Sequence, residues 1–200
     1  MFTQPIPFEI HITTKDLPKT KIDLFVNICV QNGGKPLLIE LYQGECISQP
    51  MFSKVIYSDN LNTVMAQASN YTHLLHQYGF QTKRIKTEIP ASCVDTVQIP
   101  TQPGFTPYFE WHGKIEVNRI DQLLELCSSY KAHLSRNSLK DEKQTRFLTL
   151  REYGSKEIFQ ERIDAVVSRL AQGGWQVLKQ QSEYCLSDTN IDLDKGWLPN

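Results

Sequence analysis

The sequence predicts an α+β protein made of two tandem ferredoxin-like repeats with antiparallel sheets, each in the order β-α-β-β-α-β. Three observations predict this fold. Residues 108–117 (YFEWHGKIEV) repeat the Phe-Glu-x-His pattern of residues 7–14 (PFEIHITT). The segments that follow each copy share one order of strand and helix patterns. A stretch rich in proline, 90–107, separates the two halves. We therefore interpret the chain as an internal duplication.

The elements of the first half follow from hydrophobic periodicity. Apolar residues alternate through 7–14, which predicts a strand with Glu9 and His11 on one face. Apolar residues at helical spacing after Thr20, stopped by Gly33, predict a helix. The remaining elements of this half are two strands, a helix ended by Gly79 and a last strand, at 35–42, 51–57, 58–79 and 80–89.

The second half repeats this order from Tyr108. Its first helix carries an apolar stripe that corresponds to the stripe of the first half, Ile120, Leu123, Leu124 and Cys127 against Ile22, Phe25, Val26 and Cys29. The predicted organisation is a first repeat at 1–89, a linker at 90–107, a second repeat at 108–187 and a C-terminal tail at 188–200.

The polar faces of the sheets hold the candidate site. In a ferredoxin-like unit both helices cover one sheet face, so the Glu-x-His pairs should look out from the other face. The last strand of each unit lies beside the first, which places its polar residues next to these pairs. The candidate ligand-binding residues are Glu9, His11, Lys86, Glu88, Glu110, His112, Lys114, Lys179 and Glu183.

The two Glu-x-His pairs also suggest a metal site. Histidine supplies a nitrogen ligand and glutamate an oxygen ligand, and the i, i+2 spacing on a strand points both in one direction. Two copies could hold a transition metal through Glu9, His11, Glu110 and His112. The alternative is a solvated polar sheet face that both halves keep by common descent.

Two short motifs resemble those of known families. His11-Ile12-Thr13 resembles the His-x-Thr motif of the two-histidine phosphoesterases, an internally duplicated family in which two such motifs flank a phosphodiester. The second half has His112-Gly113-Lys114 instead. Residues 110–114 (EWHGK) are similar to the Glu-x-Glu-x-Lys strand of the CYTH triphosphate-tunnel phosphatases, with histidine for the middle glutamate. That likeness implies acidic strands that hold a divalent metal and basic strands that hold triphosphate.

The composition argues against several classes of partner. With 21 basic and 22 acidic residues, the chain has no net field that would attract nucleic acid or an anionic membrane. No apolar stretch approaches the length of a membrane helix, and the first residues lack the pattern of a signal peptide. Five widely spaced cysteines without a Cys-x-x-Cys pair favour buried reduced thiols and a cytoplasmic location.

The sequence does not name a reaction and leaves three functions open. The first is a binding module that holds an anionic small molecule or a protein partner on its polar sheet faces. The second is a hydrolase that acts on a phosphorylated substrate with a divalent metal, the one cofactor that the residues suggest. The third is an interaction or structural protein without a ligand, whose open faces could form a homo-oligomer.

Overall fold

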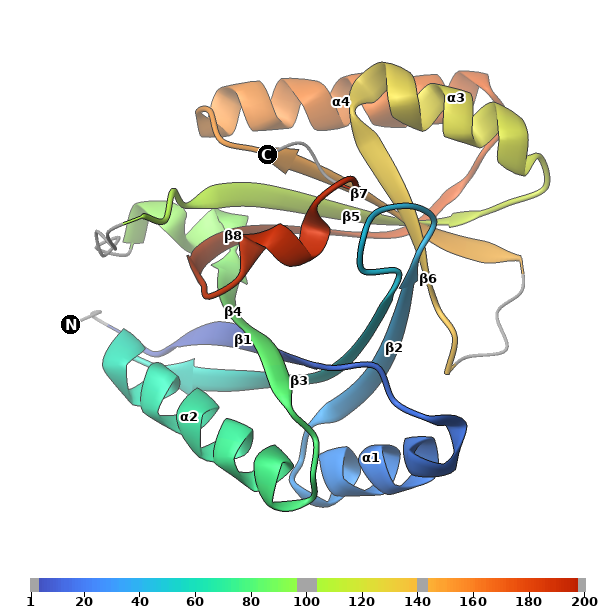
Figure 1. Ribbon diagram of the computed structural model, residues 1–200. Coiled ribbons are helices and arrows are strands. Elements are labelled where there is room, and N and C mark those ends of the chain that lie inside the picture. Colours follow the sequence, from blue (N-terminus) through green and yellow to red (C-terminus); the bar gives the residue numbers. More distant parts are fainter. Residues whose placement is uncertain (1–3, 97–103, 140–143, 198–200) are drawn as a thin grey trace.

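The strands of both halves form one closed antiparallel barrel (Figure 1). The computed structural model describes residues 4–96, 104–139 and 144–197. Around the barrel the eight strands of this part follow one another in the order β1 (Ile6–Thr14), β3 (Ser48–Ser58), β2 (Lys35–Leu41), β6 (Ala132–Asn137), β7 (Thr145–Glu152), β5 (Tyr108–Glu116), β8 (Val177–Asp188) and β4 (Thr82–Pro90), which pairs again with β1.

The barrel corrects the predicted fold. Each half has the element order β-α-β-β-α-β, but two tandem ferredoxin-like repeats with separate sheets is wrong, because the edge strands of the halves are bonded to each other. β2 pairs with β6, and β4 pairs with β8. An edge strand presents a row of unused backbone donors and acceptors, and closure into a barrel satisfies them. Hydrophobic alternation within a strand contains no information about this pairing.

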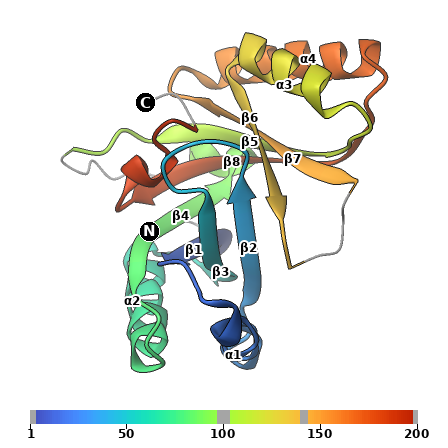
Figure 2. The same ribbon diagram turned by 45° about the vertical axis from the view of Figure 1, so that its right-hand side comes forward.

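The four α-helices of the described ranges cover the outside of the barrel in two pairs (Figures 1 and 2). Their bounds are α1 (Lys19–Gln31), α2 (Leu61–Gln77), α3 (Ile120–Tyr130) and α4 (Lys156–Gln172). The pair α1 and α2 packs on strands of the first half, and the pair α3 and α4 packs on strands of the second half. The molecule therefore has three layers, with the barrel between two layers of helices.

The apolar cores lie between the helices and the barrel wall, and not inside the barrel. In β1 the alternate residues Phe8, Ile10 and Ile12 are fully buried and pack in one core with Phe25 of α1. A second core, around Trp111, fills the same place under α3 and α4. Because side chains alternate along a strand, the residues between these apolar ones point into the barrel.

Two short 3-10 helices flank the second half. One, η1 (Ala91–Thr96), follows β4 and occupies the start of the predicted linker, of which 97–103 lie outside the described residues. The other, η2 (Ile191–Asp194), follows β8 and lies across one end of the barrel (Figure 1). Beyond η2, Trp197 is buried against Leu41, and its indole nitrogen donates to the backbone oxygen of Leu134 at 3.2 Å.

Within the three described ranges, no helix combines the length and the apolar character that crossing a membrane requires.

Candidate ligand-binding site

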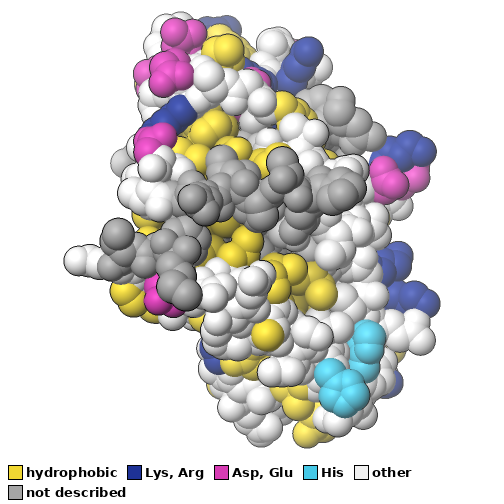
Figure 3. Space-filling view, turned by 90° about the vertical axis from the view of Figure 1, so that its left-hand side faces the viewer, with side chains coloured by type: hydrophobic (Ala, Val, Ile, Leu, Met, Phe, Trp, Pro, Cys, Tyr) yellow, Lys and Arg dark blue, Asp and Glu magenta, His cyan; other side chains and the backbone are white. Residues whose placement is uncertain are grey.

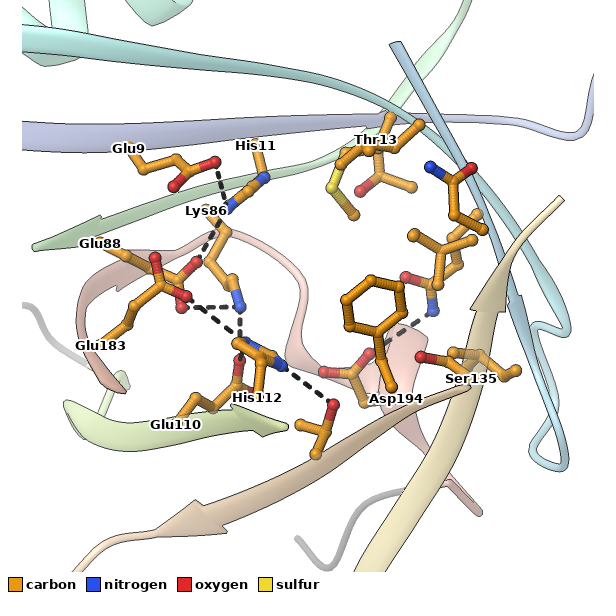
Figure 4. A pocket seen from close by; sticks show the side chains of 18 of the residues that line it. Glu9, His11, Thr13, Lys86, Glu88, Glu110, His112, Ser135, Glu183 and Asp194 are labelled. Atoms are coloured by element: carbon orange, nitrogen blue, oxygen red, sulfur yellow. Dashed lines mark hydrogen bonds and ion pairs between the residues drawn. The ribbon is translucent and has the colours of Figure 1, made fainter. Parts of the chain in front are cut away.

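A cavity of about 210 Å³ lies inside the barrel, and its wall has two different sides (Figure 4). Strands β1, β4, β5 and β8 contribute a polar side, which contains Glu9, His11, Thr13, Arg84, Lys86, Glu88, Glu110, His112, Gln181 and Glu183. Strands β2, β3 and β7, together with the C-terminal segment, contribute most of an apolar side, which contains Leu37, Ile39, Leu41, Met51, Phe147 and Trp197.

Strand register brings the charged residues of the polar side together. Glu9 of β1 lies opposite Glu88 of β4, and His11 lies opposite Lys86. In the other half, Glu110 of β5 lies opposite Glu183 of β8. Directly opposed residues on one sheet face are within contact distance. Four carboxylates are thereby concentrated at one part of the barrel interior.

Lys86 links the two halves at the centre of this group. Its ammonium nitrogen lies 2.8 Å from Glu88 Oε1 and 2.7 Å from Glu110 Oε2. Arg151 of β7 binds Glu110 from the other side, with Nη2 2.6 Å from Oε1. Burial alone would raise the pKa of Glu110, but Lys86 and Arg151 hold it well below its ordinary value. Glu110 is therefore a fully ionised, fully paired carboxylate.

A second group of ion pairs closes the end of the barrel beneath η2. Asp194 of η2 accepts hydrogen bonds from Arg84 of β4 at 2.9 Å and from Arg151 of β7 at 2.6 Å. Arg84 is also held by Asp188 of β8, with Nε donating to Oδ1 at 2.9 Å. Both guanidinium groups are thus bound by carboxylates and buried. Asp194 connects the C-terminal segment to strands of both halves.

Glu9 and His112 lie nearer to solvent than the other charged residues of this group, whereas Glu183 is buried. Exposed fractions of the side chains are 28% for His112 and 25% for Glu9, against 0% for Glu88 and 2% for Glu110. The exposed Lys35 lies at the margin of the cavity on the same side. This gradient places the opening of the cavity near Glu9 and His112, opposite the end that Asp194 and Trp197 cover.

Glu183 has the most unusual environment at this opening. Its Oε1 accepts a hydrogen bond from Gln181 at 2.7 Å, and its Oε2 lies 3.4 Å from His112 Nε2. Burial and the negative charge of Glu88 raise the pKa of Glu183 to about 8, and His112 only partly opposes them. Burial lowers the pKa of His112, but Glu110 and Glu183 together raise it above its ordinary value.

The structure brings together seven of the nine residues that the sequence suggested. Glu9, His11, Lys86, Glu88, Glu110, His112 and Glu183 all line the cavity. Lys114 and Lys179 do not; they lie opposite each other on β5 and β8, and Lys179 is exposed. Both lysines have the strand parity of the site, but the cavity ends before their position along the strands.

Sequence reasoning identified only part of the group around the predicted residues. Arg84 follows from strand alternation, because it lies two residues before Lys86 on the same face of β4. The apolar wall, Asp194 and the pairing of Arg151 with Glu110 could not be predicted, because they depend on strands and a tail whose neighbours only the closed barrel defines.

The predicted metal ligands do not form one four-ligand group. Within the described ranges, the grouping of suitable atoms is Glu9, His11 and Glu183, whose ligand atoms lie within 4.8 Å of one another. Glu110 is bound by Lys86 and Arg151, and His112 Nδ1 lies 3.0 Å from Thr149 Oγ1. The two Glu-x-His pairs therefore have different surroundings.

Comparisons with known proteins do not name a function. No protein-family model and no curated protein matches the sequence. Among solved structures, the chain is similar to a "Putative monooxygenase" from Fusobacterium nucleatum, with 14% identity, 99% of this chain and 98% of that chain covered and a TM-score of 0.33. It is also similar to a "putative glycine cleavage system transcriptional repressor", with 12% identity, 92% and 99% covered and a TM-score of 0.26. Neither likeness is close enough to indicate a shared fold or function.

Proposed function

We propose that this protein is a small-molecule-binding protein whose ligand lies inside the barrel. The observation that carries the proposal is the two-sided cavity of about 210 Å³. Liquid water occupies about 30 Å³ per molecule, so the volume suits a ligand of on the order of seven to ten non-hydrogen atoms. Small-molecule sites typically combine an apolar wall with a few polar groups that fix orientation.

The apolar side supplies the driving force for binding. Leu37, Ile39, Met51 and Phe147 line the cavity and are only half-buried, although they point into the barrel. A ligand with an apolar body would remove this surface from water, which contributes about 25 cal/mol for each Å² buried. An interaction protein without a ligand would not need such an apolar wall inside the molecule.

The polar side disfavours the anionic ligand that the sequence suggested. Arg84, Lys86 and Arg151 are the permanent cations of the interior, and each is already bound by two carboxylates. An added anion would have to displace one of them. Among the described lysines and arginines that line the cavity, this pairing leaves only the exposed Lys35, at its margin, for a phosphorylated substrate, so the hydrolase alternative gains little support from this geometry.

The outer surface gives no stronger candidate. Figure 3 shows small separate groups of acidic and basic side chains on one face, and not a continuous surface of one sign. Nucleic-acid binding depends on a concentrated basic surface. On this face, the charge distribution supports a site inside the molecule over a nucleic-acid surface.

A fragment screen against open and filled barrels tests the proposal. Leu37→Trp places an indole in the cavity, whereas Leu38→Trp adds the same group on the opposite face of β2. We expect fragments of seven to ten non-hydrogen atoms to raise the melting temperature of the wild type and of Leu38→Trp, by about 3–5 °C at ten times Kd. Leu37→Trp should not respond.

The screen also has a clear negative outcome. If no compound raises the melting temperature of the wild type and of Leu38→Trp more than that of Leu37→Trp, the interior is not a ligand site and the proposal fails. The nuclear magnetic resonance line widths of the fragments, measured with each protein, test independently whether they bind the open barrels and not the filled one.

A further inference from the structure

Two carboxylates, Glu9 at the opening of the cavity and the buried Glu183 next to it, form no ion pair with a lysine or arginine among the described residues. Among the described residues, Glu9 and Glu183 form ion pairs only with histidines, Glu9 with His11 and Glu183 with His112. The deeper carboxylates Glu88 and Glu110 differ, since each lies against Lys86. The deeper carboxylates are therefore paired with a permanent cation, whereas the ion-pair partners of Glu9 and Glu183 are histidines that can lose their charge.

The spacing of these two carboxylates suits one bridging nitrogen. Gln181 Nε2 donates to Glu183 Oε1 at 2.7 Å and to Glu9 Oε2 at 3.4 Å. A single nitrogen thus already reaches both groups, but the amide is neutral and supplies no positive charge. An ammonium group donates three hydrogen bonds and carries the missing charge.

A separate buried group in the cavity also lacks a partner. Thr13 is 1% exposed and lines the cavity, and its Oγ1 has no hydrogen-bond partner among the described residues. It lies on the same face of β1 as Glu9 and His11, and Figure 4 shows it at the wall of the cavity. A buried hydroxyl without a partner costs free energy, which a ligand group in the cavity would recover.

We propose that the ligand is a small organic amine, an inference that rests on the proposed function. Its ammonium group binds between Glu9 and Glu183, and its apolar body lies against Leu37, Met51 and Phe147. The raised pKa of Glu183 supports this assignment, because it reflects neighbouring negative charge that a bound cation would neutralise. A bare metal ion would satisfy the carboxylates and make no use of the apolar wall.

Three matched compound sets test the charge of the ligand. Each set has one apolar body with an ammonium, a hydroxyl or a carboxylate group: 2-phenylethylamine, 2-phenylethanol and phenylacetate; cyclohexylmethylamine and its alcohol and acid; heptylamine and its alcohol and acid. Titration calorimetry at pH 7 should show at least one amine binding at least tenfold more tightly than its alcohol, and no carboxylate binding as tightly as its amine.

Carboxylate variants locate the ammonium group. Glu9→Gln and Glu183→Gln should each weaken amine binding at least tenfold and leave binding of the alcohol within twofold. Glu116→Gln removes an exposed carboxylate of β5 outside the cavity and should leave both unchanged. If the two site variants and Glu116→Gln behave alike, the ammonium does not lie between Glu9 and Glu183.

The pH dependence of amine binding gives a further readout. Glu183 faces Glu9 and His11 of β1, Lys86 and Glu88 of β4, and Glu110 and His112 of β5. A bound ammonium should ionise Glu183, so affinity should rise between pH 6 and pH 8 in the wild type and in Glu9→Gln. Glu183→Gln should lose most of this rise and keep the smaller part that loss of the His112 proton contributes. A flat profile in the wild type would contradict the assignment.

The outcomes separate this inference from the proposed function. If fragments bind inside the barrel but no amine exceeds its alcohol, the protein is a small-molecule binder and the amine assignment is overturned. If zinc or manganese alone binds through Glu9 and Glu183 while all amines fail, the cation is a metal and the assignment is likewise overturned. If no fragment distinguishes Leu37→Trp from the wild type, the proposed function fails first.

Discussion

Glu183 shows how the pKa of a single buried carboxyl depends on the cations that surround it. Glu88, on the adjacent strand, is equally enclosed, but Lys86 and His11 keep its pKa below the ordinary value despite burial. Glu183 forms no ion pair with a lysine among the described residues, and burial with the charge of Glu88 raises its pKa to about 8 despite the opposing effects of His112 and Lys86. The two carboxyls differ in their cationic neighbours, so the difference is local.

This environment predicts a pH-dependent stability. In the folded protein Glu183 keeps its proton up to about pH 8, whereas in the unfolded chain it loses it near its ordinary value of 4.5. Between these values the folded state binds more protons, so the free energy of unfolding should fall as pH rises. Glu183→Gln should fall less steeply and exceed the wild type at pH 8 by on the order of 3 kcal/mol.

Urea unfolding at pH 5, 6, 7 and 8 measures this difference. His112, whose pKa is raised, contributes stability that is present below pH 6.5 and lost as pH rises, so a shallower slope should remain in Glu183→Gln. Glu116→Gln should follow the wild type, because this carboxylate is exposed. Parallel curves for Glu183→Gln and the wild type would show that Glu183 is ionised throughout this range.

At the scale of single elements, the sequence predicted the direction of side chains better than their neighbours. Alternation in β1 correctly separated Phe8, Ile10 and Ile12 from Glu9 and His11, because the twofold period of a strand is a local property. The position of Lys114 relative to the cavity was not predictable in this way. It depends on the stagger of strands around the barrel, which is set by pairing between distant segments.

Helix ends provide a test at this scale. Helices α1, α2 and α4 are each followed by a glycine with positive φ, Gly33 at 67°, Gly79 at 80° and Gly174 at 78°. Helix α3 is followed instead by Lys131, a residue with a Cβ, at φ 51°. This backbone region disfavours residues other than glycine by about 1–2 kcal/mol.

Lys131→Gly should therefore stabilise the protein. Part of the gain is lost because glycine gives the unfolded chain more freedom, so we expect an increase of about 0.5–1 kcal/mol in the free energy of unfolding. Lys131→Ala is the matched control, since it removes the same side chain but keeps the Cβ. Chemical denaturation of both variants decides the point, and equal stability of the two would show that the left-handed conformation costs nothing here.

At the scale of the whole molecule, closure of the barrel explains both the wrong fold prediction and the site. The polar faces that the sequence assigned to two open sheets instead meet inside one barrel, where they must neutralise each other. Lys86 of the first half binds Glu110 of the second, and Arg84 binds Asp188 and Asp194. The charged residues were visible in the sequence, but their enclosure required knowledge that β2 meets β6 and β4 meets β8.

The two halves should consequently not fold alone. A fragment of residues 1–96 would leave the edges of β2 and β4 open and would strip Lys86 and Arg84 of Glu110, Asp188 and Asp194. Removing one partner of a buried ion pair typically costs about 3–5 kcal/mol, which is a large part of the stability of a domain. We expect fragments 1–96 and 97–200 each to lack a cooperative unfolding transition by circular dichroism, and to regain it when mixed.

A full chain cut within 97–103 after folding, at an inserted protease site, is the control and should stay associated in gel filtration. A fragment that elutes as a monomer and unfolds cooperatively would mean that each half is a domain in its own right, and that closure of the barrel only joins two already stable units.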